Sequence, residues 1–132
     1  MAWDLDSDRP IFAQIAERIQ IQIVSGKYPP GGKLPSVREL AAVAAVNPNT
    51  MQKAFEKLER SGLIITQRTN GRQVTEDAEL VRSVRALLAK GHVEAFFSKM
   101  RELGYTGEEV IALCTEILEG QDVPVTEREG EL

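Results

Sequence analysis

Apolar residues recur every three to four positions through most of the chain, which is the period of an α-helix with one buried face. We expect the first helix to begin near Pro10, since proline suits a first helical position, and to end at Gly26. Gln14 and Glu17 fall on its polar side. The residues of its apolar stripe are Ile11, Phe12, Ile15, Ile19 and Ile23. Prolines and glycines in residues 27–33 predict a loop.

A short second helix is predicted by a capping motif. Ser36 and Glu39 are three residues apart, so each side chain can satisfy a free backbone N–H of the first turn. The helix is expected to end by Ala45. Its inner face consists of Val37, Leu40, Ala41 and Ala44.

The third predicted helix has one apolar and one polar face. Asn47 suits an N-cap, Pro48 a first helical position and Gly62 a C-terminal stop. The apolar residues are Met51, Ala54, Phe55 and Leu58. The polar residues are Asn49, Thr50, Gln52, Lys53, Glu56 and Lys57. Because a polar helix face is usually just solvated, this helix alone does not indicate a function.

A β-hairpin and a helical tail are expected after the third helix. Residues 63–66 and 72–75 predict two strands, and Asn70-Gly71 between them is the strongest short hairpin signal. Apolar spacing then predicts two helices, separated by a turn at residues 104–107. We expect Gly91 to be a point where the first of these helices can bend or break.

Charge is unequally divided along the chain, whose net charge is −4. Residues 1–75 contain ten Lys and Arg against seven Asp and Glu, whereas residues 76–132 contain six against thirteen. A basic front half can face DNA phosphates while an acidic rear half faces away from them. No apolar run approaches the roughly 20 residues of a membrane span, and no secretion signal is visible, so we expect a cytoplasmic protein without membrane contact.

The start of the third helix has side chains of the types that read DNA. The major groove admits one α-helix, whose first turns reach the base edges. Asn and Gln can pair with adenine, Lys can reach guanine, and a helix N-terminus attracts phosphate. Arg68 and Arg72 flank the predicted hairpin tip and can reach a minor groove or the neighbouring backbone. Double-stranded DNA is therefore the predicted partner, with a protein-binding winged helix as the alternative.

Catalysis and metal binding are disfavoured. His92 and Cys114 are the only histidine and cysteine, too few for a zinc site or a nucleophilic triad. Two acidic pairs lie near predicted helix starts, where acids favour the helix dipole: Asp77 with Glu79, and Glu108 with Glu109. We predict no enzyme, no metal and no cofactor.

These motifs resemble the GntR family of bacterial regulators over roughly residues 8–75. The similar runs are Pro10 to Ile15, Ser25-Gly26 with Pro30-Gly31, Leu34 to Ala41, Val46 to Phe55, and Leu58 to Ile64. The resemblance implies DNA contacts from Arg38, from the start of the third helix and from the wing glycine, Gly71. The family's wing often has two closely spaced glycines before an aromatic–Val pair, whereas this chain has Asn70 to Val74. The predicted DNA-binding residues are Ser36, Arg38, Asn47, Asn49, Thr50, Gln52, Lys53, Arg68, Asn70, Gly71 and Arg72.

The short C-terminal part resembles the tail of the YtrA subfamily, in which the tail forms the dimer. Only 57 residues follow residue 75, too few for the larger ligand-binding domains of the family. Two short helices cannot bury all their large apolar residues against one small domain, so a second copy is expected to cover them. The alternative is that the tail folds back on its own winged helix. The predicted dimer residues are Leu87, Leu88, Phe96, Phe97, Met100, Leu103, Leu113, Ile117 and Leu118.

The predicted fold class is therefore mostly α with a small β-hairpin. We expect a winged helix-turn-helix in residues 1–75, a short α-helical dimerisation tail in residues 76–120, and a flexible acidic tail in residues 121–132. The predicted function is a repressor that binds a palindromic operator as a homodimer. The sequence leaves open whether an unidentified small-molecule effector is also a partner.

Overall fold

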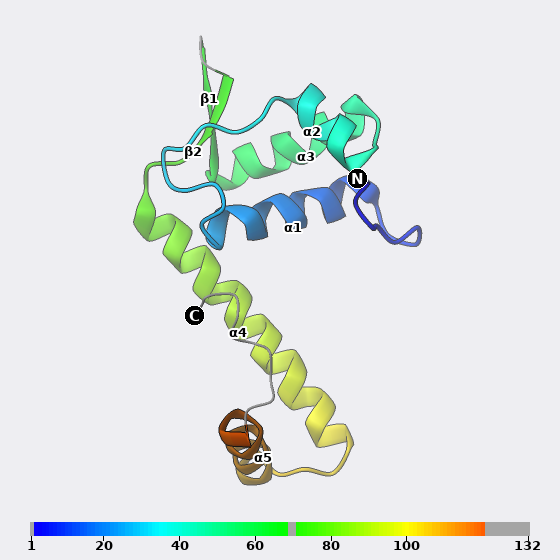
Figure 1. Cartoon of the computed structure of the whole chain (residues 1–132), viewed down its shortest axis with the longest axis vertical. Helices are drawn as coiled ribbons and strands as arrows, with labels where there is room; N and C mark the ends of the chain where they lie inside the picture. Colours follow the sequence, from blue (N-terminus) through cyan, green and yellow to red (C-terminus); the bar gives the residue numbers. More distant parts are fainter. Residues whose placement is uncertain (1, 69–70, 121–132) are drawn as a thin grey trace. The chain divides into compact units, whose positions relative to one another are not determined.

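The computed structural model describes residues 2–68 and 71–120 (Figure 1). Its elements are α1 (Ile11–Val24), α2 (Val37–Ala44), α3 (Pro48–Ser61), β1 (Ile64–Gln67), β2 (Gly71–Val74), α4 (Ala78–Glu102) and α5 (Gly107–Gly120). The predicted order of helices and hairpin, and with it the fold class, is confirmed. Residues up to Leu87 form one compact unit and those from Leu88 another, so α4 contributes to both.

The core of the first unit is formed where α1 and α2 pack against α3. Ile15, Ile19 and Phe55 are fully buried there. Each such side chain contributes about 1.5–3 kcal/mol by leaving water. The apolar stripes predicted for the three helices thus meet one another, which turns the polar side of α3 outward.

Local hydrogen bonds fix the start of α2 and the turn that joins α2 to α3. The Oγ atom of Ser36 accepts from the backbone N–H of Glu39 at 3.0 Å, and the Glu39 carboxylate accepts from the N–H of Ser36 at 2.8 Å, which confirms the capping box. Ala45 ends α2 in the left-handed conformation, with φ 60° and ψ 48°. Asn47 then caps α3 by accepting from the N–H of Asn49 at 2.7 Å.

The hairpin is tied to the loop before α2. β1 and β2 are antiparallel with Ile64 opposite Val74, and each strand lies one residue closer to the hairpin tip than predicted. The N–H of Leu34 donates to the carbonyl of Arg72 at 2.9 Å, and the N–H of Val74 donates to the carbonyl of Gly32 at 2.8 Å. The loop therefore pairs with β2 on the side away from β1, and fixes the base of the hairpin beside α2.

The N-terminal segment is part of the same core, which the sequence pattern did not indicate. The side chain of Gln14 accepts from the N–H of Asp6 at 2.7 Å and donates to the carbonyls of Asp6 and Arg9 at 2.8 and 3.0 Å. Gln14 is 7% exposed, so its expected place on the wet side was wrong. Its amide is buried because the preceding segment folds back over it and satisfies its polar atoms. Trp3 and Leu5 pack against the core from this segment.

The helical tail differs from expectation at Gly91. α4 continues from Ala78 to Glu102 without a break, so of the two expected effects of Gly91, a bend or a break, the break is wrong. A single glycine lowers helix propensity by about 1 kcal/mol, which neighbouring helical residues can offset. Thr106 and Glu109 form the reciprocal hydrogen bonds of a second capping box at the start of α5. Val110 is 1% exposed and is the main buried residue of this unit.

Candidate DNA interface

The start of α3 presents the predicted reading residues to solvent. Asn49 and Lys53 are exposed, while Thr50 and Gln52 are half-buried. Met51 is fully buried, which fixes the rotation of the helix about its own axis. The geometry therefore brings the four polar side chains onto the outer face of the first two turns, as their spacing predicted.

Two of these side chains have partners within the protein. The Nε2 atom of Gln52 donates to the carboxylate of Glu56 at 3.1 Å. The Nζ atom of Lys53 lies 5.3 Å from the centre of the Phe12 ring on α1. Both contacts are near the surface, where they cost little to exchange for contacts with bases.

Ser36 and Asn47 serve first as helix caps. Each uses a side-chain oxygen to accept a backbone N–H of its own helix. The Ser36 hydroxyl hydrogen and the Asn47 amide N–H groups remain chemically able to donate to a phosphate. Their positions at the starts of α2 and α3 thus combine a structural role with access to the outer face.

Three of the predicted DNA-binding cations are exposed and are not paired with acids. Arg38 near the start of α2, Lys53 on α3 and Arg68 after β1 make no ion pair within the described parts of the chain. Unpaired cations on one unit are available to neutralise DNA phosphates.

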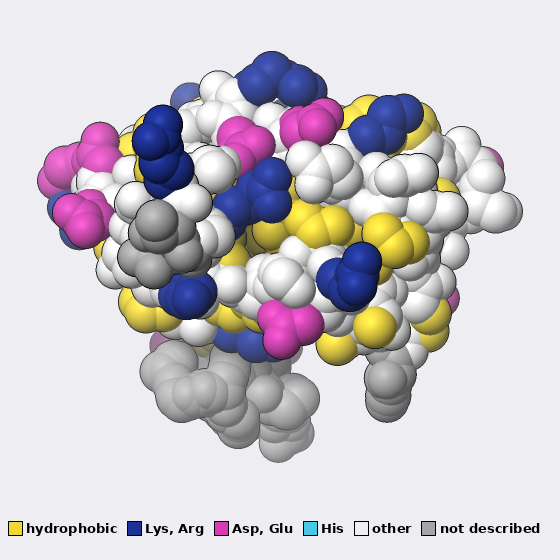
Figure 2. All heavy atoms as spheres, turned by 90° about the horizontal axis from the view of Figure 1, so that it is seen from above, with side chains coloured by type: hydrophobic (Ala, Val, Ile, Leu, Met, Phe, Trp, Pro, Cys, Tyr) yellow, Lys and Arg dark blue, Asp and Glu magenta, His cyan; other side chains and the backbone are white. Residues whose placement is uncertain are grey.

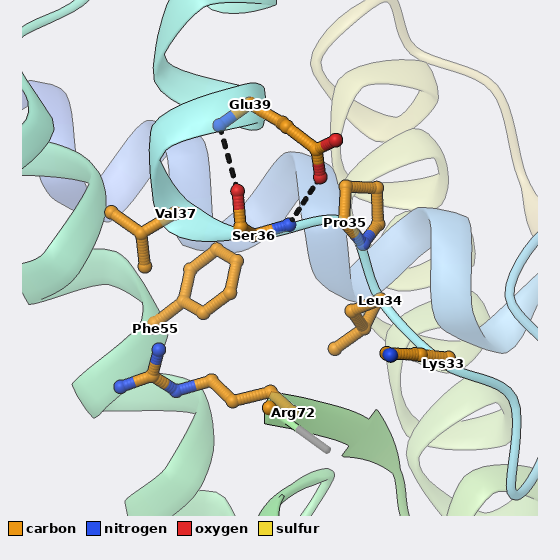
Figure 3. A pocket seen from close by; sticks show the side chains of 9 residues that line it. Lys33, Leu34, Pro35, Ser36, Val37, Glu39, Phe55 and Arg72 are labelled. Atoms are coloured by element: carbon orange, nitrogen blue, oxygen red, sulfur yellow. Dashed lines mark hydrogen bonds between the residues drawn. The ribbon is translucent and has the colours of Figure 1, made fainter. Parts of the chain in front are cut away.

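Arg72 behaves differently from the other predicted cations. Its Nε atom donates to the Glu59 carboxylate at 3.0 Å, and its side chain is 22% exposed. Its guanidinium carbon lies 5.2 Å from the centre of the Phe55 ring (Figure 3). Arg72 is thus held against α3, and sequence reasoning missed Glu59 because 13 residues separate the pair.

The remaining predicted wing residues are placed in part. Gly71 begins β2 in an exposed position with φ 76°, a conformation that glycine adopts readily. Asn70 lies outside the described residues. The pairing of β1 with β2, which includes Gly71 and Arg72, is confirmed.

A hollow of about 340 Å³ lies between the loop before α2, α3 and β2. Leu34, Pro35, Val37 and Phe55 line its apolar part, and Arg72 lies at its edge (Figure 3). Figure 2 shows Lys and Arg side chains around a hydrophobic depression on this end of the molecule, with Asp and Glu between them. The hollow arises from contacts distant in sequence, so no local pattern could have predicted it.

Other kinds of site find no support in the described residues. They contain no cluster of three or more His, Cys, Asp or Glu side chains suited to a metal ion. None of the helices traced between residues 2 and 120 is both long and apolar enough to span a membrane. Cys114 is a free thiol on α5.

Comparison with known proteins agrees with this geometry. A family model described as bacterial regulatory proteins, gntR family, matches residues 12–74. The chain is 40% identical over 114 residues to the uncharacterized HTH-type transcriptional regulator YhcF of Bacillus subtilis, covering 86% of this chain and 94% of YhcF. It is 45% identical over 76 residues to the HTH-type transcriptional repressor YtrA of the same organism, covering 58% of each.

A solved structure extends the likeness beyond the winged helix. The GntR family transcriptional regulator from Listeria monocytogenes superposes with a TM-score of 0.80 at 40% identity, covering 86% of this chain and 99% of that one. The relatives are transcription regulators rather than enzymes, and those that resemble YtrA support the subfamily expected from the short tail. This chain therefore belongs to the GntR family and is a DNA-binding transcriptional regulator of the winged helix-turn-helix type.

Proposed function

We propose that this regulator is a homodimeric repressor that binds a palindromic operator. The observation that carries the proposal is the outer face of α3, which presents four polar side chains while Met51 and Phe55 hold the helix to the core. The four are Asn49, Thr50, Gln52 and Lys53. The repressor role is supported by the name of the similar protein YtrA. Residues of these types at the start of an outward-facing helix suit the major groove.

The contacts divide by chemistry. Asn49, Thr50 and Gln52 read base edges, and Lys53 reaches a guanine or a phosphate. Arg38 and Arg68 contact phosphates, because both are exposed and unpaired among the described residues. Further contacts to the DNA backbone come from the helix caps Ser36 and Asn47 and from the wing residues Asn70 and Gly71.

Dimerisation is proposed for the helical tail. Leu87 is 71% exposed and Leu103 72%, while Phe96 is 41% exposed although its ring packs edge-on against Phe97 at 5.7 Å. A helix pair that leaves such large side chains in water is typical of an interface. A second copy that covers them would create the two-fold symmetry that a palindromic operator requires.

The proposal also includes a binding site for a small-molecule effector and a location in the cytoplasm. A small hollow of about 280 Å³ lies in the second unit, with walls from Phe97, Tyr105 and Val110 and with Arg101 as a cation. We assign the effector no chemistry beyond small size. The cytoplasm is the proposed location because the DNA partner is there.

The salt dependence of binding tests the function. Fluorescence anisotropy with a labelled fragment of the protein's own promoter should show log K falling with log salt, with a slope of about −0.9 for each phosphate contacted. A scrambled fragment should bind much more weakly. Binding that is independent of salt and of sequence would support the protein-binding alternative instead. Arg85→Ala, on the exposed surface of α4, is the control that should leave the slope unchanged.

A further inference from the structure

We propose that Glu59 is a positioning residue that holds the hairpin against the recognition helix through Arg72 and Thr66. This inference rests on the proposed DNA contacts of α3 and the wing. It assigns a role to an acidic residue that lies between two basic DNA-contacting elements. It also changes the main role of Arg72 from phosphate contact to support of the wing.

The geometry converges on one carboxylate oxygen. Oε2 of Glu59, near the end of α3, accepts from Nε of Arg72 on β2 at 3.0 Å and from the hydroxyl of Thr66 on β1. Thr66 and Arg72 are partners in the strand register. One acceptor on α3 is therefore bound by both strands of the hairpin at the same level.

Burial makes this contact stronger than an ordinary surface pair. The side chains of Arg72 and Glu59 are 22% and 26% exposed, whereas the other ion pairs of the described residues are between 49% and 82% exposed. Phe55, fully buried, provides the surface on which the Arg72 guanidinium lies. Partial desolvation strengthens a charge-assisted hydrogen bond, and the aromatic face adds a cation–π attraction.

The position of this contact of Glu59 with Arg72 and Thr66, here called the clamp, explains how it affects DNA binding. The carbonyl of Arg72 also accepts from the N–H of Leu34, in the loop that leads into α2. Arg72 is therefore joined to the loop by its backbone and to α3 by its side chain. Without the side-chain contact, the base of the hairpin stays in place, but the hairpin can change its angle to α3. That angle sets the distance between the wing and the DNA groove.

The direction in which Glu59→Gln changes DNA affinity separates this positioning role from a simple electrostatic effect. Removing a negative charge beside DNA should tighten binding if Glu59 is a bystander. If Glu59 positions the wing, Glu59→Gln should instead weaken operator binding by about tenfold or more, because the charge-assisted hydrogen bond that holds the hairpin to α3 is lost. The matched control is Glu56→Gln, one turn earlier on α3. Its carboxylate accepts only from Gln52 among the described residues, so this variant removes a charge and frees a reading residue, and it should bind as tightly as the wild type or more tightly.

Arg72 and Thr66 give two further readouts. Arg72→Ala should weaken binding without changing the salt slope, whereas a phosphate contact would reduce the slope by about 0.9. Thr66→Val should weaken binding in the same direction as Glu59→Gln, and Thr66→Ser, which keeps the hydroxyl, should restore it. Thermal unfolding of every variant identifies those that simply fail to fold.

Amide hydrogen exchange of the free protein tests the clamp independently of DNA. In Glu59→Gln the amides of residues 64–67 and 71–74 should exchange faster, while those of α1 should not change. Unchanged hairpin exchange, or tighter DNA binding by Glu59→Gln, overturns the inference. Failure of the wild type to bind DNA would count against the proposed function, but it would leave the exchange result as a valid test of the contact.

Discussion

The ammonium group of Lys53 lies 5.3 Å from the centre of the Phe12 ring, so the polar face of α3 touches the start of α1. An exposed cation–π contact of this kind contributes about 0.5–1 kcal/mol. A bidentate contact with guanine discriminates by about 1–3 kcal/mol, which is larger. If Lys53 contacts DNA as proposed, the loss of the ring contact is therefore the smaller of the two effects.

Replacing Lys53 tests its place in the interface. Lys53→Ala should reduce operator affinity by about 1–3 kcal/mol if it contacts a base, and should reduce the free energy of unfolding by no more than about 1 kcal/mol. Anisotropy titration and urea unfolding measure the two effects. Lys57→Ala, one turn later on α3, is the matched control and should lose less affinity. Equal losses for the two variants would remove Lys53 from the reading residues.

Replacing Ser36 tests the capping box at the start of α2. Ser36→Ala should lower the free energy of unfolding by about 0.5–2 kcal/mol, since the N–H of Glu39 loses its acceptor. Urea unfolding followed by circular dichroism measures this loss. The control is Ser83→Ala in α4, where the hydroxyl donates only to the carbonyl of Leu80 and alanine is the better helix former. If Ser83→Ala destabilised the protein as much as Ser36→Ala, the capping box would not be the cause.

Two glycines should respond to alanine with opposite signs. Gly91→Ala should raise the melting temperature, because α4 is continuous there, an added Cβ meets nothing within 4 Å, and alanine favours the helix by about 0.8–1.0 kcal/mol. Gly71→Ala should lower it, because φ is 76° and the left-handed region costs alanine about 1–2 kcal/mol. Its Cβ also meets nothing within 4 Å, so the difference in sign isolates backbone conformation. A melting temperature lowered by Gly91→Ala would show that α4 is not helical at this point in solution.

A charge on the tail tests the dimer. Phe96→Glu should convert a dimer into a monomer in sedimentation equilibrium, because an ionised carboxylate cannot be buried without a partner. Ile21→Glu is a matched control, since Ile21 is 52% exposed on α1, outside the predicted interface. A wild-type protein that sediments as a monomer would exclude the dimer, and the tail would then have to be covered by other means.

The features that could be predicted from the sequence are those fixed by neighbouring residues. Three helix ends are fixed by residues within one helical turn, and the structure shows all three where they were expected. They are the start of α2 at Ser36 with Glu39, the start of α3 at Asn47 with Pro48, and the end of α3 at Gly62. The outward face of α3 also followed from local spacing, because Met51 and Phe55 could only point inward together.

The features that were missed depend on contacts between distant segments. Gln14 is buried because residues 6–9 fold over it, and nothing in the helical period indicates this. The contact between Glu59 and Arg72 requires the hairpin to return beside α3 at a particular angle. Gly91 was expected to bend or break its helix, and the break is wrong, because helix propensity acts over the whole of α4 rather than at one residue.

The left-handed conformation of Ala45 indicates that the turn between α2 and α3 is less stable than it could be. It is the one residue other than glycine with positive φ in the described segments, and alanine pays about 1–2 kcal/mol for that conformation. Glycine would remove this strain but would add about 0.4–1 kcal/mol of chain entropy to the unfolded state. Ala45→Gly should therefore raise the free energy of unfolding by a net amount of up to about 1.5 kcal/mol, measured by urea unfolding, and a loss of stability would contradict the strain. The extra stability of Ala45→Gly would make this variant a suitable parent for further substitutions in the turn between α2 and α3 that unfold the wild-type protein.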